Sequence, residues 1–166
     1  ERFGKIDILV NNAGITRDNL IMRMKEEDWD AVMHTNLKGI FNCTKAAVKH
    51  MLRTGGSIVN IASVVGVMGN AGQANYSASK SAIRGFSQAL RRELADSSVE
   101  VIHVAPRAIA TALNSEAVNA LNREMGSRAD SPEAAARQIV AALRGGRGES
   151  HFGFPERLFA WLNGCA

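Results

Sequence analysis

Short apolar runs alternate with longer amphipathic stretches along this chain of 166 residues. The runs at 6–11, 57–62 and 99–105 carry Ile and Val between polar or glycine residues, which is typical of strands buried in a parallel sheet. Apolar positions at helical spacing predict helices over residues 28–53 and 75–95. This alternation of strand and helix predicts an α/β fold with a parallel sheet and right-handed crossovers.

Capping residues set the limits of the two predicted helices. Asp28 is the expected N-cap of the first helix, and the glycines at 55–56 end it. Asn75 or Ser77 begins the second helix. Asn36 lies inside the first helix, where an asparagine is more ordinary on the surface; a buried one would hold a local irregularity or a water.

The last third of the chain carries a second set of elements. Ser131 followed by Pro132 predicts a helix over 131–143, with the serine as N-cap and the proline at the first helical position. The other elements predicted there are a helix over 113–124, a short strand over 151–154 and an amphipathic helix from residue 155 onward.

Composition excludes several classes of protein. The net charge is +4, and no apolar run approaches the ~20 residues that span a membrane. The N-terminus has no signal-peptide pattern, and Cys43 and Cys165 are too few for a disulfide framework. We therefore expect a cytoplasmic protein with no membrane span. The scattered histidines predict no metal site, and no nucleic-acid motif, repeat or low-complexity segment is present.

Three arginines give the second predicted helix a basic character. Arg84, Arg91 and Arg92 fall along residues 75–95. The ordinary interpretation is a solvated helix face, and the alternative is a surface that attracts an acidic partner or an anionic substrate.

The stretch from Ser63 to Lys80 carries the most distinctive chemistry. Ser63 follows the strand 57–62, and Tyr76 and Lys80 lie four residues apart on one face of the helix 75–95. A lysine cation beside a tyrosine lowers the phenol pKa from about 10. A serine hydroxyl can hydrogen-bond the carbonyl that the tyrosine protonates, so the set can transfer a proton while hydride moves to or from carbon. Each residue alone also has an ordinary structural interpretation.

Two other strand ends fall on the same side of the predicted sheet. The tetrapeptide 11–14 follows one strand, and Thr111 follows Pro106 at the end of another. In open α/β sheets, ligands bind outside the carboxyl ends of the strands. Small residues at 13 and 14 let a flat ligand approach the backbone, although an ordinary strand-to-loop turn explains the tetrapeptide equally well.

In this order and at these spacings, the motifs resemble those of the short-chain dehydrogenase/reductase superfamily. From about Ile8 to Pro106 the chain looks most like bacterial 3-oxoacyl-[acyl-carrier-protein] reductases, over NNAGITRDNLIMRMKEEDWDAVMHTNLKGIFNCTKAA and IVNIASVVGVMGNAGQANYSASK. The resemblance implies a partial Rossmann-like, doubly wound parallel sheet that lacks its first βαβ units. It is carried by Asn12-Ala13-Gly14, Asn36, Ser63, Tyr76-Ser77-Ala78-Ser79-Lys80, Pro106 and Thr111.

The resemblance also implies roles for these residues. Tyr76 would be the general acid, and Lys80 would lower its pKa and hold the nicotinamide ribose. Ser63 would hydrogen-bond the substrate carbonyl, and Asn36 would place a water that links Lys80 to solvent. Ile109, through its backbone, and Thr111 would meet the nicotinamide amide or the phosphates. The implied cofactor-binding residues are Asn12, Ala13, Gly14, Tyr76, Lys80, Pro106, Ile109 and Thr111.

The chain departs from the family pattern in three places. The family's N-terminal third, with the glycine-rich turn that cradles the pyrophosphate, is absent from the sequence, so we expect a fragment or a chain that has lost its front end. Arg107 stands where the family has glycine, and we expect it to crowd the nicotinamide or to change the loop. From about Ala112 onward the chain leaves the reductase pattern and ends in HFGFPERLFAWLN, a region that shapes the substrate pocket.

Together these points predict one truncated domain over 1–166, with a catalytic and nicotinamide half at 1–111 and a divergent substrate-side segment at 112–166. The resemblance implies NADP(H)-dependent reduction of a 3-oxoacyl thioester, on acyl carrier protein or CoA, to the 3-hydroxyacyl form, with NAD(H) as the other candidate cofactor. It also implies a homo-oligomer in the full-length form. The alternatives are a short-chain enzyme for another ketone or secondary alcohol, and an inactive remnant.

Overall fold

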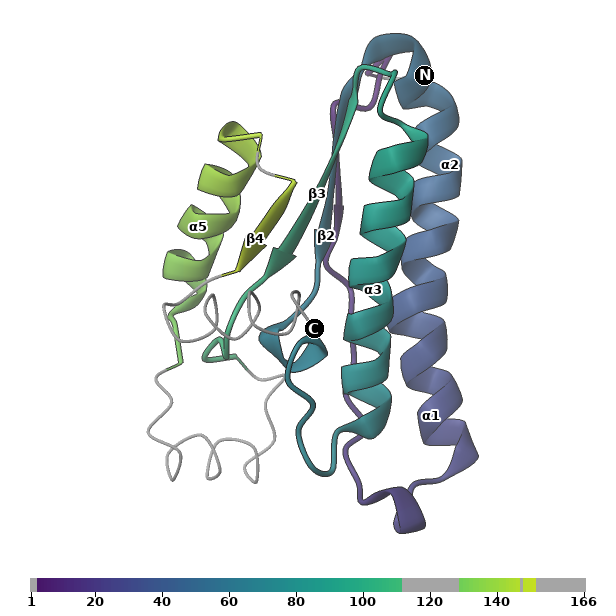
Figure 1. The fold of residues 1–166 in the computed structure, drawn as a ribbon, viewed down its shortest axis with the longest axis vertical. Coiled ribbons are helices and arrows are strands. Elements are labelled where there is room, and N and C mark those ends of the chain that lie inside the picture. Colours follow the sequence, from purple (N-terminus) through teal and green to yellow (C-terminus); the bar gives the residue numbers. More distant parts are fainter. Residues whose placement is uncertain (1–2, 112–128, 147, 152–166) are drawn as a thin grey trace.

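The computed structural model describes residues 3–111, 129–146 and 148–151. A four-stranded sheet in the order β1-β2-β3-β4, with every neighbouring pair parallel, lies between two layers of helices (Figure 1). The predicted partial, doubly wound α/β fold is therefore confirmed. The elements are β1 (Ile8–Asn11), η1 (Ile21–Arg23), α1 (Glu26–Met33), η2 (His34–Lys38), α2 (Gly39–Thr54), β2 (Gly56–Ile61), η3 (Val64–Gly66), α3 (Ala74–Glu93), β3 (Val99–Ala105), α5 (Pro132–Arg144) and β4 (Glu149–His151).

The central strands β2 and β3 are buried on both faces, which explains their continuous apolar runs. Successive side chains point to opposite faces of a strand, so Ile58 packs with α2 and α3 while Val59 packs with α5. The core under α2 and α3 comprises Ala47, Met51, Ile58, Leu90, Leu94, Val99 and Val101. The core under α5 comprises Val59, Ile61, Ile102, Val104 and Ala142.

The helix predicted over 28–53 is observed as one run with an irregular centre. Asp28 is not its N-cap, because the helix begins at Glu26 and Lys25 stands at the cap. Acidic side chains fill the first turn and complement the positive end of the helix dipole, which explains the earlier start. The π-helical segment η2 separates α1 from α2, and Asn36 lies within it.

A buried polar network joins the sheet to the two helices that cover it. Asn11 Nδ2 donates to Thr44 Oγ1 on α2 at 3.1 Å and to Asn60 Oδ1 on β2 at 2.8 Å. Asn60 Nδ2 donates to Ser87 Oγ on α3 at 2.9 Å. All four residues are buried. Because each amide has partners inside the protein, these polar groups fix β1 and β2 against α2 and α3 without an unmet hydrogen bond at these atoms.

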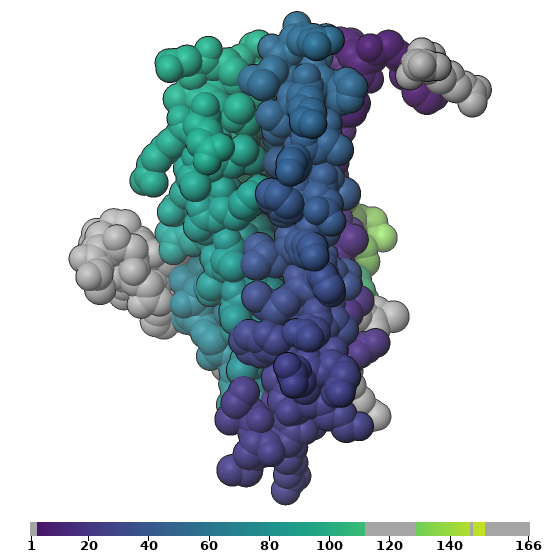
Figure 2. All heavy atoms as spheres, turned by 90° about the vertical axis from the view of Figure 1, so that its right-hand side faces the viewer, coloured from purple at the N-terminus to yellow at the C-terminus, as the bar shows by residue number. Residues whose placement is uncertain are grey.

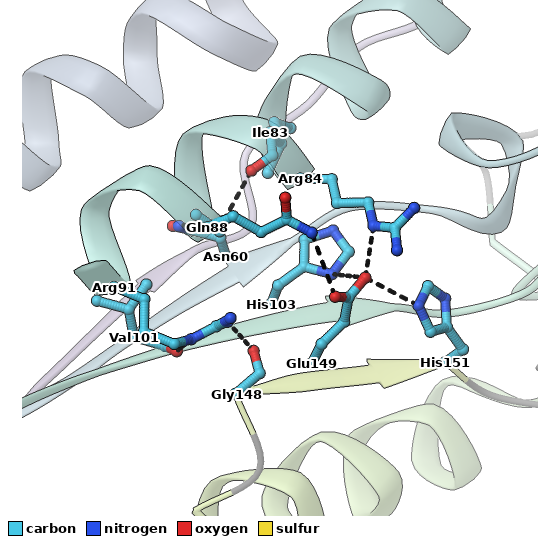
Figure 3. Close-up of polar contacts among 11 residues, drawn as sticks. Asn60, Ile83, Arg84, Gln88, Arg91, Val101, His103, Gly148, Glu149 and His151 are labelled. Atoms are coloured by element: carbon cyan, nitrogen blue, oxygen red, sulfur yellow. Dashed lines mark hydrogen bonds and ion pairs between the residues drawn. The ribbon is translucent and has the colours of Figure 1, made fainter. Parts of the chain in front are cut away.

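A polar cluster holds the short strand β4 beside α3 (Figure 3). Arg84 Nε donates to Glu149 Oε1 at 2.6 Å, and His151 Nε2 lies 3.0 Å from the same oxygen. Arg91 donates to carbonyl oxygens of β3 and of the residue before β4. The prediction of a solvated face is therefore wrong for Arg84 and Arg91, because β4 brings a carboxylate and a carbonyl to them. Arg92 is exposed.

Ser131 caps α5 as predicted. Its hydroxyl accepts a hydrogen bond from Ala134 N–H at 3.2 Å, and Pro132 begins the helix. The strand predicted over 151–154 is observed earlier, at β4, whose backbone pairs with the end of β3. The remaining predictions lie outside the described residues: the rest of that strand, the helix over 113–124 and the helix from residue 155.

The open edge of the sheet exposes apolar side chains. Ile8 and Val10 on β1 are 51% and 52% exposed. β1 is an edge strand of the four-stranded sheet, and these two apolar side chains are open to solvent there. Within the part of the chain that the structure describes, no helix combines the length and apolar character needed to cross a membrane.

Candidate functional site

Of the four side chains predicted to be catalytic, which include Asn36, the structure brings three together where β2 ends and α3 begins. Ser63 follows β2 and caps η3, with its hydroxyl accepting from Val65 N–H at 3.3 Å. Its hydroxyl is also hydrogen-bonded to the phenol of Tyr76. The Nζ of Lys80 lies 5.5 Å from the centre of the Tyr76 ring and donates to Ile61 O at 3.0 Å. The hydroxyl, the phenol and the cation therefore form one site.

Burial controls the acidity of the tyrosine. Desolvation raises the pKa of Tyr76 to about 12, with a smaller rise from the negative charge of Asp18, and the Ser63 hydrogen bond lowers it only in part. Burial lowers the pKa of Lys80 to about 8. The net shift of the Tyr76 pKa is therefore upward, because burial of the phenol is its largest cause, and a lowering of this pKa by Lys80 stays a prediction. At neutral pH the phenol is protonated and able to donate.

Asn36 is fully buried and organises the neighbouring backbone. Its Oδ1 accepts from Ile15 N–H at 2.8 Å, and its Nδ2 donates to Ile15 O at 3.0 Å and to Ser79 Oγ at 3.1 Å. The interpretation of Asn36 as a helix-surface residue is wrong, because the irregular segment η2 turns the amide inward. Asn36 thus connects the segment after β1 to the helix that carries Tyr76 and Lys80.

The residues after β1 leave space beside the lysine. A Cβ placed on Gly14 would lie 3.4 Å from Asn36 Oδ1 and 3.7 Å from Lys80 Nζ. Asn12 and Ala13 are exposed at the carboxyl end of β1. The small residues therefore keep a surface open next to the cation, as the approach of a flat ligand requires.

The loop after β3 contacts both the serine segment and the start of α5. Pro106 O accepts from Val64 N–H at 3.0 Å, beside Ser63. Ile109 forms a parallel bridge with Asp130, and Thr111 is exposed. The unexpected Arg107 directs its guanidinium to the Asp130 carboxylate. The loop predicted to meet the nicotinamide therefore begins next to the three catalytic candidates.

A sequence model of the family described as "short chain dehydrogenase" matches residues 1–122. The chain belongs to this family. The match covers all of the residues predicted to form the site. It therefore agrees with the resemblance drawn from the residues themselves.

Individual relatives are similar over most of this chain but only part of their own length. The chain is 50% identical to 3-oxoacyl-[acyl-carrier-protein] reductase FabG of Staphylococcus aureus over 125 residues, which is 75% of this chain and 51% of that protein. For the FabG proteins of Thermotoga maritima and Vibrio cholerae, the identities are 47% over 146 residues and 54% over 121 residues. These alignments cover 84% and 70% of this chain, and 59% and 50% of the relatives. The chain thus spans about half the length of the curated relatives it matches.

Two positioning residues of this short chain dehydrogenase were missed by reasoning from the sequence. Ser79 is fully buried, donates to Tyr76 O at 2.7 Å and accepts from Asn36. Asn75 is not the N-cap of α3, which is Gln73; its Nδ2 instead donates to Arg17 O at 3.0 Å. The available signal was the run of small and polar residues on a helix that otherwise carries an apolar face. Such residues need partners when they are buried.

Gly66 allows η3 to lie directly on α3. A Cβ at Gly66 would lie 2.7 Å from Lys80 C, which is backbone and cannot give way. We predict that Gly66→Ala pushes η3 and Ser63 away from the lysine segment and lowers turnover at least tenfold, because ~1 Å displacements at a catalytic site have effects of this order or larger. Turnover and thermal unfolding should both be measured.

Gly69→Ala provides the matched control for that substitution. Its added Cβ would meet Ser77 Oγ at an ordinary 4.0 Å, so this variant should keep its activity. Equal turnover in the two variants would contradict a role for the close contact at Gly66.

Proposed function

We propose that this chain provides the catalytic half of an NADP(H)-dependent reductase that converts a 3-oxoacyl thioester to the 3-hydroxyacyl form. The observation that carries the proposal is the convergence of Ser63, Tyr76 and Lys80 in one partly buried site of a short chain dehydrogenase. The substrate class follows from the activity for which the FabG relatives are named. The site geometry supports proton transfer to an oxygen atom of the substrate. The activity of the relatives suggests that this oxygen belongs to a carbonyl group.

The proposed chemistry follows from the protonation states at neutral pH. Tyr76 carries its proton and donates it to the substrate carbonyl oxygen, which becomes the alcohol. Ser63 donates a hydrogen bond to the same oxygen while negative charge develops there. Lys80 has a pKa near neutrality, so it can pass a proton toward the phenolate that remains. Asn36, held by Ile15 and Ser79, keeps the lysine segment in place.

A nicotinamide nucleotide fits the residues at one end of the site. It would supply the hydride that reduces the carbonyl carbon. The space beside Gly14, the Lys80 ammonium group and the exposed Thr111 hydroxyl would hold its nicotinamide ribose and amide, together with the backbone of residues 12–13, Pro106 and Ile109. The sequence offers no glycine-rich strand–turn–helix for the phosphates. We propose NADP(H) over NAD(H) because the chain follows the FabG sequences so extensively.

Oxidation of the reduced cofactor tests this function directly. NADPH or NADH would be supplied to the 166-residue chain with an acetoacetyl thioester, and in parallel with simple ketones. Turnover of the thioester with NADPH is the expected result. A preference for simple ketones or secondary alcohols would favour a short-chain enzyme with another substrate. Absence of saturable nucleotide binding would identify an inactive remnant and contradict the proposal.

We further propose a cytoplasmic homo-oligomer in the full-length form that accepts its substrate from acyl carrier protein. An apolar groove runs between α1–α2 and α3 on the outer face of these helices (Figure 2). Met33, Leu37, Phe41 and Phe86 line this groove, and Phe41 is 46% exposed. The groove is not lined by Ser63, Tyr76 or Lys80, so it is free to contact a second copy. Light scattering that finds only monomer would contradict self-association.

A further inference from the structure

Asp130 holds the loop after β3 through its backbone and its side chain. Its N–H donates to Ala108 O at 2.8 Å, and its carbonyl oxygen accepts from Ala110 N–H at 2.9 Å. Its carboxylate accepts two hydrogen bonds from Arg107, from Nε at 2.9 Å and from an Nη at 2.6 Å. One residue at the start of α5 therefore fixes three positions of the loop 106–111.

The paired geometry makes this contact more than a surface ion pair. Two parallel N–H···O bonds between a guanidinium and a carboxylate restrict both groups in direction as well as distance. The Asp130 side chain is only 12% exposed, and that of Arg107 is 33% exposed. Hydrogen bonding from Arg107 is the main reason that the pKa of Asp130 lies below its ordinary value. The carboxylate is therefore charged, and paired, throughout the neutral pH range.

The loop between these anchors connects two parts of the proposed site. At its start, Pro106 O accepts from Val64 N–H at 3.0 Å, which ties the loop to the residue after Ser63. At its other end, Ile109 bridges to Asp130, and Thr111, in the segment that follows the carboxyl end of β3, is exposed. The orientation of the backbone at 108–111 thus depends on where Asp130 is held, and Arg107 holds it from the side of the serine segment.

We propose that the Arg107–Asp130 ion pair positions the loop 106–111 to bind the nicotinamide end of the cofactor, an inference that rests on the proposed function. Neither residue touches the reacting atoms; both are positioning residues. When the ion pair is lost, the loop samples other arrangements, and only a fraction of the protein molecules can bind the cofactor. The apparent dissociation constant for the cofactor then rises in inverse proportion to that fraction. The chemical step in the bound complex keeps its rate.

The experiment compares NADPH binding and turnover in a set of variants of the 166-residue chain. If one tenth of the Arg107→Ala molecules keep a loop that is competent to bind, the Kd for NADPH should rise about tenfold, as measured by fluorescence titration. The KM for NADPH should rise by the same factor. The kcat at saturating NADPH should not change. Asp130→Asn should have a similar effect. The double variant should lose less affinity for NADPH than the sum of the two single variants, because both substitutions remove the same contact. Arg107→Lys should fall between wild type and Arg107→Ala, since an ammonium keeps the charge without the paired geometry.

Arg53→Ala is the matched control, because it removes the same charge at an exposed position near the end of α2. It should leave both constants at wild-type values. If Arg107→Ala does not fold by circular dichroism, Arg107→Lys and Asp130→Asn decide the matter. The inference is overturned if the wild type binds NADPH and the folded Arg107 and Asp130 variants bind it with the same Kd. It is also overturned if kcat falls in these variants while KM is unchanged. Both outcomes leave the proposed function standing. Absence of NADPH binding in wild type overturns both.

Discussion

Replacing Tyr76 with phenylalanine is expected to reduce turnover by a factor of roughly 10²–10⁴, the range that a positioned general acid contributes. The phenol is hydrogen-bonded to Ser63 and carries its proton at neutral pH, since burial raises its pKa to about 12. Phenylalanine keeps the ring beside Lys80 and removes only the proton donor. The measurement is thioester-dependent NADPH oxidation at saturating substrate. Tyr76 is the only tyrosine of the chain, so no neighbouring phenol can replace it.

The variant must remain folded for that result to have meaning. The lost Ser63 hydrogen bond should cost about 1 kcal/mol of unfolding free energy, which thermal or chemical denaturation can measure. The NADPH dissociation constant should change little, because the ring and the lysine stay in place. Ser77→Ala, one residue further along α3, is the control and should keep wild-type turnover. Wild-type turnover in Tyr76→Phe would rule out the proposed proton donor.

The strands and the order of elements were predictable because they depend on local pattern. β2 and β3 are buried on both faces of the sheet, so apolar side chains occupy both faces of each strand. Such a largely apolar run can be recognised in the sequence. Ser131 and Pro132 mark the start of α5 by short-range chemistry alone. The closeness of Ser63, Tyr76 and Lys80 was also predictable, because an i,i+4 pair on a helix after a strand-end serine has a definite geometry; their roles came from the family resemblance.

The features that the sequence did not reveal depend on contacts between distant segments. Asn36 is buried because η2 departs from α-helical geometry and directs the amide toward Ile15, 21 residues away in the chain. The high pKa of Tyr76 reflects desolvation, which no spacing of residues specifies. Arg84 is paired because β4 places Glu149 beside it, 65 residues later. Each outcome required knowing which segments pack together.

Acidification below pH 6.5 is expected to destabilise this fold through His103. This histidine of β3 is 1% exposed, and neither ring nitrogen is hydrogen-bonded within the described residues. Its Nδ1 lies 3.8 Å from Glu149 Oε1, beyond hydrogen-bonding distance but close enough for an ion pair when the ring is protonated (Figure 3). Burial lowers its pKa to about 4, and the positive groups Arg84 and Arg91 on α3, together with His151 on β4, add to that effect; Glu149 on β4 opposes it. The folded state therefore resists a proton that the unfolded chain accepts.

The sign and the size of this effect follow from proton linkage. At pH values well above 6.5 neither state protonates His103, and its contribution does not vary with pH. Between pH 6.5 and 4 the unfolded chain binds the extra proton, so the free energy of unfolding falls by up to ~3 kcal/mol. Glu149, whose pKa is lowered to about 2 chiefly by its hydrogen bond with His151, adds a second loss only as the pH falls from 4.5 toward 2.

Urea denaturation at pH 7.5, 6, 5 and 4.5 separates the histidine from the carboxylate. His103→Leu keeps an apolar side chain of similar size and has nothing to protonate, so its unfolding free energy should stay nearly constant over this range. At pH 7.5 it should be at least as stable as wild type, because the unpartnered ring nitrogens are gone. His50→Asn, at an exposed position on α2, should keep the wild-type slope. A steep loss that persists in His103→Leu would contradict this prediction and assign the acid sensitivity to other groups. A flattened curve would mean that one buried, neutral histidine accounts for most of the stability that the chain loses over this pH range.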